Sequence, residues 1–88
     1  MSKYLDDARR QCDKIKYYYE FGRESGYSQA VPHYNKLCGL IRRASESKNN
    51  KNDSFIIQRM MESSKPLMQE MKQWQDDYLA KESQDSKK

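Results

Sequence analysis

The sequence predicts an all-α protein that folds as an antiparallel up-down-up bundle of three helices. Three segments carry apolar residues at alternating intervals of three and four, which is the spacing of one helix face. A break bracketed by glycines at residues 22–26 and a polar stretch at residues 45–53 separate these segments. Connections this short favour antiparallel neighbours within one chain over the alternative, an extended coiled coil between chains.

The first amphipathic segment is expected to run to about Phe21. Its apolar stripe consists of Leu5, Ala8, Cys12, Ile15 and Tyr19. Aromatic residues crowd the end of this segment, and four of them within five positions do not all fit against one core. We expect Tyr17 to lie over neighbouring aliphatic surface, and an aromatic ledge that contacts a partner is the alternative.

The central segment contains two residues that disfavour a helix. Its stripe consists of Tyr27, Ala30, Tyr34, Leu37, Ile41 and Ala44, and Ser25 is placed to cap its start. Pro32 lies off the stripe, so the helix is expected either to kink at Pro32 or to start near it. Gly39 weakens the helix by roughly 1 kcal/mol relative to alanine.

The third segment is the longest and carries more apolar surface than one seam requires. Its stripe consists of Ile57, Met60, Ser64, Leu67, Met71, Trp74 and Tyr78. Asp53 or Ser54 is expected to cap this helix, which should kink or split at Pro66. Four further apolar residues widen its face: Phe55, Ile56, Met61 and Met68.

One core is expected from the three stripes. Its predicted members are Leu5, Ala8, Cys12, Ile15, Tyr34, Leu37, Ile41, Met60, Leu67, Met71 and Trp74. The 88 residues are 35% hydrophobic and 34% charged, which predicts a thin apolar seam inside a charged exterior. Residues 1–80 should form this single domain, and residues 81–88 a flexible charged tail.

Positive charge is concentrated in the middle of the chain. Residues 27–52 contain five basic residues against Glu46 alone, although the whole chain carries only +4. This distribution would draw an acidic partner to one edge of the molecule. A solvated face without a partner is the alternative reading of the same charges.

Several classes of function lack their sequence signature. No apolar run is long enough to span a membrane, and no apolar signal core opens the chain. Cys12 and Cys38 do not make a disulfide framework and are expected as thiols, which favours an intracellular, cytoplasmic protein. The chain has no glycine-rich phosphate loop, no Cys or His cluster for a metal and no nucleophilic triad, so we expect neither an enzyme nor a cofactor or metal.

Two other functions remain as alternatives. The string His33-Tyr34-Asn35-Lys36 resembles the His-x-x-Lys core of histidine phosphotransfer domains, which implies phosphorylation at His33. That family follows its Lys with small residues, whereas Leu37 follows Lys36 here and the bulky Tyr34 lies beside His33, so a solvent-facing His33 is favoured. The basic edge also permits nucleic-acid binding, but no helix-turn-helix or base-stacking signature accompanies it.

The pattern Gly26-Tyr27-x-x-Ala30-x-x-x-Tyr34, followed by Leu37, Ile41 and Ala44, resembles the second helix of microtubule-interacting and trafficking (MIT) domains. The likeness extends over about residues 3 to 80. It implies a non-catalytic three-helix adaptor that receives an amphipathic helix from a protein partner beside its third helix. ESCRT-type filament subunits are such partners, and some members instead contact tubulin in microtubules through basic residues.

The resemblance and the residue pattern together predict a partner site. Apolar residues off or beside the core stripes should line the groove, and we assign Leu40, Met61 and Met68 to it, with a place in the core as the alternative for the two methionines. Basic residues should match an acidic partner, and we assign Lys36, Arg42 and Arg43 to that role.

Overall fold

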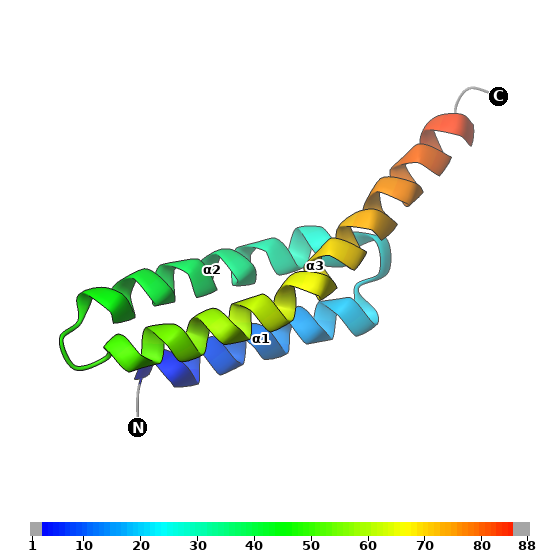
Figure 1. Ribbon diagram of the computed structural model, residues 1–88. Helices are drawn as coiled ribbons and strands as arrows, with labels where there is room; N and C mark the ends of the chain where they lie inside the picture. Colours follow the sequence, from blue (N-terminus) through cyan, green and yellow to red (C-terminus); the bar gives the residue numbers. More distant parts are fainter. Residues whose placement is uncertain (1–2, 86–88) are drawn as a thin grey trace.

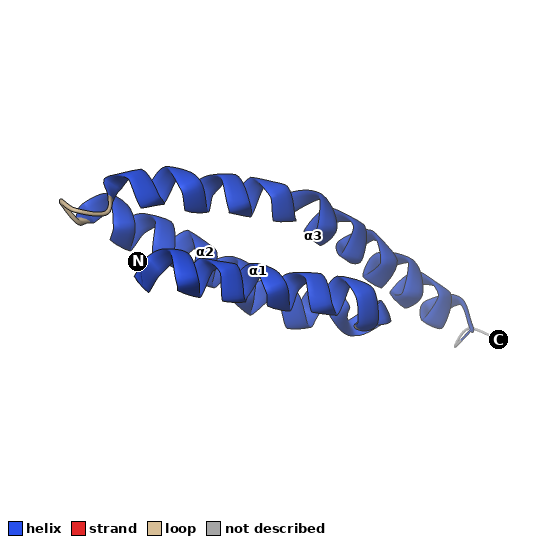
Figure 2. Ribbon diagram, turned by 90° about the horizontal axis from the view of Figure 1, so that it is seen from below, coloured by secondary structure: helices blue, strands red, loops and turns tan. Residues whose placement is uncertain are grey.

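A computed structural model describes residues 3–85 of the chain, with side chains as far as Glu82. It contains helix α1 (Lys3–Phe21), the short 3-10 helix η1 (Arg23–Ser25), helix α2 (Gly26–Glu46) and helix α3 (Lys51–Asp85). The three long helices pack pairwise side by side, as Figures 1 and 2 show, and the described residues contain no strand. The predicted all-α, three-helix bundle is therefore confirmed.

The turn between α1 and α2 is closed by two glycines. The Gly22 amide donates to the Tyr18 carbonyl at 2.8 Å. A Cβ atom on Gly22 would lie 2.5 Å from the Gly26 Cα, and one on Gly26 would lie 2.6 Å from the Tyr18 carbonyl oxygen. Both distances are shorter than any side chain tolerates, so the two helix ends approach this closely only because both residues are glycine.

Ser25 lies at the start of α2, but its hydroxyl does not cap that helix. It donates instead to the Gly22 carbonyl at 2.9 Å and accepts from Gln29 Nε2 at 3.0 Å. The predicted capping bond is therefore wrong, because the 3-10 turn presents the Gly22 carbonyl to this hydroxyl. Arg23, with φ of 51°, takes the left-handed conformation in the same turn.

Helices α2 and α3 are each longer than predicted. Pro32 lies inside α2, six residues after the helix starts at Gly26, and is exposed. The loop that follows is confined to residues 47–50, and α3 begins at Lys51 rather than at a cap on Asp53 or Ser54. Short bonds among residues 47–54, such as Asn50 Nδ2 to Ser47 Oγ at 2.9 Å, close this connection.

Helix α3 is not split at Pro66. It continues from Lys51 to Asp85, its C-terminal part bends away from α1 and α2 in Figure 1, and it extends past their ends in both views (Figures 1 and 2). Pro66 has no N–H to donate to the carbonyl four residues earlier, which permits such a bend. The helix also passes through the expected boundary at residue 80, while residues 86–88 of the expected tail lie outside the described part.

The core is a narrow seam along the bundle. Its buried apolar members are Ala8, Ile15, Ala30, Leu37, Leu40, Ala44, Ile57, Met68 and Met71. Four of these were among the eleven predicted core residues, and six other predicted residues are half-buried against the seam. Trp74 was wrongly predicted, because it is 41% exposed where α3 starts to leave the bundle, with its ring 5.2 Å from that of Tyr19.

Candidate partner-binding grooves

A groove between α2 and α3 has an apolar floor. Tyr27, Val31 and Tyr34 contribute its α2 side, at successive turns of the helix, and Met68 faces them from α3. The groove encloses about 240 Å³ and is open to solvent along its length. Because residues at these spacings share one helix face, the three α2 side chains form a continuous row.

Polar and basic side chains form the rim of the α2/α3 groove. Lys65, Gln69 and Lys72 line it from α3, and Asn35 from α2. Burial raises the pKa of the Tyr34 phenol above its ordinary value, with a smaller effect from Cys38. Tyr34 therefore remains protonated in neutral solution, and its hydroxyl is able to donate a hydrogen bond to an acidic ligand.

Met68 was assigned to the groove beside the core, with a place in the core as the alternative, and the structure shows the alternative. The side chain is only 7% exposed and belongs to the buried seam. Met68 therefore has two roles, because it is part of the core and also forms the floor of the groove. A substitution at Met68 therefore alters folding and the groove together.

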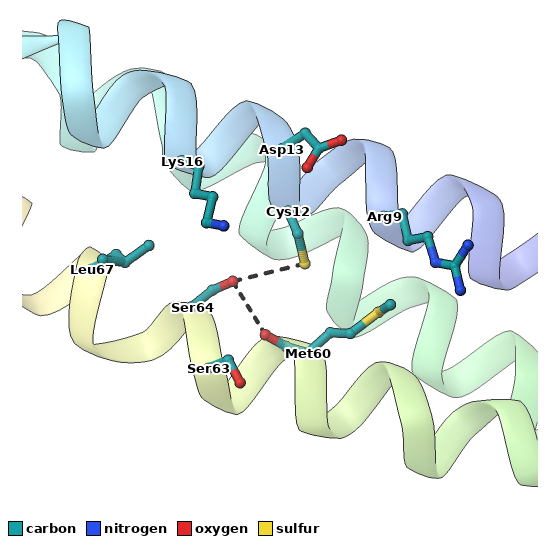
Figure 3. Close-up of a pocket in the computed structure, with 8 residues that line it drawn as sticks. All are labelled: Arg9, Cys12, Asp13, Lys16, Met60, Ser63, Ser64 and Leu67. Carbon is teal, nitrogen blue, oxygen red and sulfur yellow. Dashed lines mark hydrogen bonds between the residues drawn. The ribbon is translucent and has the colours of Figure 1, made fainter.

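A second groove separates α1 from α3 (Figure 3). It encloses about 330 Å³ and is lined by Arg9, Cys12, Asp13, Lys16, Met60, Ser63, Ser64 and Leu67. The hydroxyl of Ser64 lies 3.8 Å from Cys12 Sγ and 3.2 Å from the Met60 carbonyl oxygen. Its floor is therefore polar at the centre, unlike that of the α2/α3 groove.

Burial raises the pKa of the Cys12 thiol above its ordinary value, against a smaller opposing effect of the Ser64 hydroxyl. Cys12 is thus a neutral thiol near pH 7, which is unsuited to nucleophilic attack. Cys38 is exposed, and its sulfur lies 3.7 Å from the thioether of Met61. Met61 is half-buried on α3, so it was correctly expected beside the core rather than in it.

Three of the predicted partner-binding residues meet at a third hollow, between α1 and α2. Lys36, Leu40 and Arg43 line it together with Asp7 and Gly39. Leu40 was expected outside the core and is instead 6% exposed, because it points between α1 and α2 into the seam. Arg42 is exposed and does not line this hollow. The six predicted residues are consequently spread over separate parts of the surface and core.

His33 is held in a chain of hydrogen bonds rather than facing solvent freely. Its Nδ1 lies 2.7 Å from Gln11 Oε1, and Gln11 Nε2 donates to Asp7 Oδ1 at 2.9 Å. Since the amide oxygen of Gln11 only accepts, Nδ1 carries the proton. Burial, followed by Lys36 and Lys14, lowers the pKa of the imidazole, and its ring stacks on Tyr18 at 5.8 Å.

No protein-family model, curated protein or solved structure matches this chain. The resemblance to MIT domains therefore stays a prediction from the residue pattern. Within residues 3–85 no helix is both long and apolar enough to cross a membrane. Among the described residues, no group of three or more His, Cys, Asp or Glu side chains is placed to hold a metal ion.

The sequence contains a signal for the α2/α3 groove, although the predicted stripe of the central helix combined two of the groove residues, Tyr27 and Tyr34, with the core. Tyr27, Val31 and Tyr34 repeat at intervals of four and three, parallel to the buried row that contains Ala30 and Leu37. Lys65 and Lys72 are seven residues apart and so share one face of α3. Dividing the central stripe into the row of Tyr27 and Tyr34, with Val31 added, and the row of Ala30 and Leu37 would have identified the α2 side of the groove.

Proposed function

We propose that this protein is a non-catalytic helical interaction module, resembling an MIT domain, whose α2/α3 groove binds an acidic amphipathic helix. The observation that supports this function is the combination of an apolar floor and a basic rim in one open groove. Recognition of a helix in such a groove uses apolar anchors spaced by one turn.

The dimensions of the α2/α3 groove suit two turns of a partner helix. Tyr27 and Tyr34 are seven residues apart, which is about 10 Å along α2. A partner with apolar residues at positions i, i+3 or i+4, and i+7 would face this row and Met68. The thioether of Met68 and the half-buried tyrosines provide a floor that adapts to different apolar anchors.

Charge favours an acidic partner for this groove. Lys65 and Lys72 line the same side of α3, also about 10 Å apart. Carboxylates seven residues apart on the partner would face both ammonium groups. Lys36, Arg42 and Arg43 are exposed, so they are able to increase the association rate without contacting the groove floor.

The resemblance to MIT domains suggests the class of partner. ESCRT-type filament subunits would supply an amphipathic helix, and tubulin would supply an acidic surface. The α1/α3 groove is the second place where a helix fits beside α3. We favour the α2/α3 groove because Ser63, Ser64 and Asp13 make the lining of the other groove more polar.

Titration with acidic amphipathic peptides taken from ESCRT-type filament subunits tests this function. Val31→Asp places a charge on the apolar floor and should weaken binding by at least about tenfold, mainly through faster dissociation. The paired Lys65→Glu and Lys72→Glu change should slow association and reverse its salt dependence. Ser63→Asp in the α1/α3 groove is the matched control and should leave binding unchanged.

Circular dichroism of each variant separates a lost site from a lost fold. The lysine pair is exposed, so its effect on binding is interpretable even if Val31→Asp lowers stability. Binding that is abolished by Ser63→Asp and kept by the other variants would assign the partner to the α1/α3 groove. Failure of every acidic helix to bind the wild-type chain would refute the proposed function.

The two alternative functions are tested with the same protein. Nucleic-acid binding would show a steep loss of affinity with salt for both single-stranded and duplex probes. Phosphotransfer would show acid-labile phosphate on His33 after incubation with a phosphodonor. His33→Gln is the control for that reaction, because it removes the imidazole and retains a side chain that hydrogen-bonds.

A further inference from the structure

The two ends of the bundle carry opposite charge. The described residues 3–10 and 36–62, at the end that holds the α2–α3 loop, include nine basic residues and five carboxylates. Residues 19–35 and 69–82, at the other end, include three basic residues and six carboxylates. The molecule extends over 60 × 20 × 16 Å, so this separation of charge lies along a rod.

The basic end exposes two large apolar side chains on the side of α3 that faces away from the bundle. Phe55 is 67% exposed and Ile56 is 44% exposed, whereas Ile57 next to them is buried. Phe55, Ile56, Arg59 and Glu62 border one shallow surface hollow, and Lys51 lies one turn before Phe55. We call residues 51–62 on this side of α3 the outer face.

The acidic end exposes a matching pair on the part of α3 that projects beyond α1 and α2 (Figure 1). The last contacts to the bundle's other helices near this point include the Ser28 Oγ to Gln75 Oε1 bond at 2.9 Å. Beyond it, Tyr78 is 42% exposed and Leu79 is 51% exposed, beside Asp76, Asp77 and Glu82. We call residues 76–85 the overhang.

We propose that the overhang of one copy of this chain docks on the outer face of a second copy, head to tail. Tyr78 and Leu79 would cover Phe55 and Ile56, and the carboxylates of the overhang would lie near Lys51 and Arg59. Lys81 of the overhang would offset Glu62 of the outer face. Each surface thus provides the apolar pair and the charge that the other lacks.

The shape of the molecule favours a second copy over the chain's own overhang as the occupant. The outer face and the overhang lie at opposite ends of a 60 Å rod, so one chain does not cover its own outer face. The ten residues of the overhang span about 15 Å and the twelve residues of the outer face about 18 Å, so the two surfaces match in length. A contact between two different patches repeats from copy to copy and produces chains of molecules or a ring.

Sedimentation velocity over protein concentrations from about 10 to 500 µM tests this assembly, because an interface this small is expected to be weak. The wild-type chain should form species larger than a dimer, and these should diminish as salt rises. Phe55→Ser with Ile56→Ser should block the outer face, and Tyr78→Ser with Leu79→Ser should block the overhang. Tyr17→Ser, at an exposed aromatic residue on α1 outside both surfaces, is the control and should assemble like the wild type.

Mixing the two blocked variants gives the decisive measurement. Each variant alone should be monomeric, whereas the equimolar mixture should form a 1:1 dimer and nothing larger, because only one outer face and one overhang remain. Lys51→Glu should weaken assembly about two- to fivefold, and mixing it with an Asp77→Lys chain should recover part of that loss. Dimers formed by either blocked variant alone would indicate a symmetric contact and overturn the proposal, as would a wild-type chain that stays monomeric or a mixture that does not associate.

Discussion

Glycine has opposite roles at two places in this chain. At Gly22 and Gly26 the neighbouring backbone leaves no room for a Cβ atom, whereas an added Cβ on Gly39 would meet nothing within 4 Å. The sequence pattern alone treats the three positions alike, as breaks or weak points of a helix. Only the packing of α1 against α2 distinguishes the glycines that the fold requires from the one that only weakens α2.

Alanine substitutions should therefore act in opposite directions. Gly26→Ala should lower the free energy of unfolding by roughly 1 to 3 kcal/mol, because the backbone at Tyr18 has to move. Gly39→Ala should raise it by roughly 0.4 to 1 kcal/mol, since alanine favours a helix and restricts the unfolded chain. Urea denaturation of both variants measures the two effects, and a destabilised Gly39→Ala variant would show that the α1/α2 hollow is tighter than described.

His33 should make the stability of the protein depend on pH. Its pKa in the folded state is lowered, chiefly by burial, so folding favours the neutral imidazole. The resulting stabilisation is complete above the unfolded pKa of about 6.5 and is lost as the pH falls through the lower folded pKa. The urea midpoint should consequently fall more between pH 7 and pH 5 in the wild type than in His33→Gln. Equal slopes for the two proteins would contradict this coupling.

The two cysteines should differ in their reaction with iodoacetamide. Cys38 is exposed, whereas Cys12 is half-buried and its pKa is raised. A raised pKa leaves less thiolate at a given pH and burial restricts access to the sulfur, so Cys12 should be alkylated more slowly than Cys38 at pH 8. Mass spectrometry of Cys12→Ser and Cys38→Ser chains assigns each rate, and the opposite order would contradict the burial of Cys12.

At the level of the helices, sequence periodicity predicted the existence and pairing of all three but not their limits. The 3–4 spacing reports which face of a helix is buried, and Ala8, Ile15, Leu37 and Met71 are buried as predicted. The spacing does not report where a neighbouring helix ends. Trp74 and Tyr78 continue the stripe of α3, yet they are 41% and 42% exposed because they lie where α3 leaves the bundle.

The candidate groove was harder to predict for a related reason. A groove requires two rows of side chains from different helices, and its floor is at the same time the edge of the core. Met68 appeared surplus in a one-dimensional pattern because the stripe already supplied Leu67 and Met71. In the structure Met68 is buried by α2, which a pattern within α3 alone does not contain.

Helix α3 should therefore divide into a protected and a labile part. Residues up to Gln75 contact α1 and α2, for example through Trp74 on Tyr19 and Gln75 on Ser28. Amide hydrogen exchange should be slow around Ile57 and Met71 and fast beyond residue 76, because the described side chains of residues 76–82 are all exposed. This measurement belongs at low protein concentration, where the proposed assembly is absent. Uniform protection along α3 would show that the overhang is covered in the monomer.

At the level of the whole molecule, one thin seam has to stabilise the entire chain. A domain of this size is expected to have a free energy of unfolding of roughly 4 to 13 kcal/mol. The seam contains nine buried apolar residues, three of which are alanines that allow the helices to approach closely. A large core side chain therefore contributes a large fraction of the total stability.

Leu37 and Ile41 provide the comparison that tests this description of the core. Leu37 is fully buried between the helices, whereas Ile41, which lies one turn further along the same predicted stripe, is half-buried. Leu37→Ala should cost roughly 2 to 5 kcal/mol, because it leaves a cavity in the middle of the seam. Ile41→Ala should cost less, since part of its side chain already contacts water and a smaller cavity remains. Urea midpoints of the two variants, with far-ultraviolet circular dichroism as the measure of helix content, give both values. Equal costs for the two substitutions would mean that the side chain of Ile41 is buried in the seam as fully as that of Leu37.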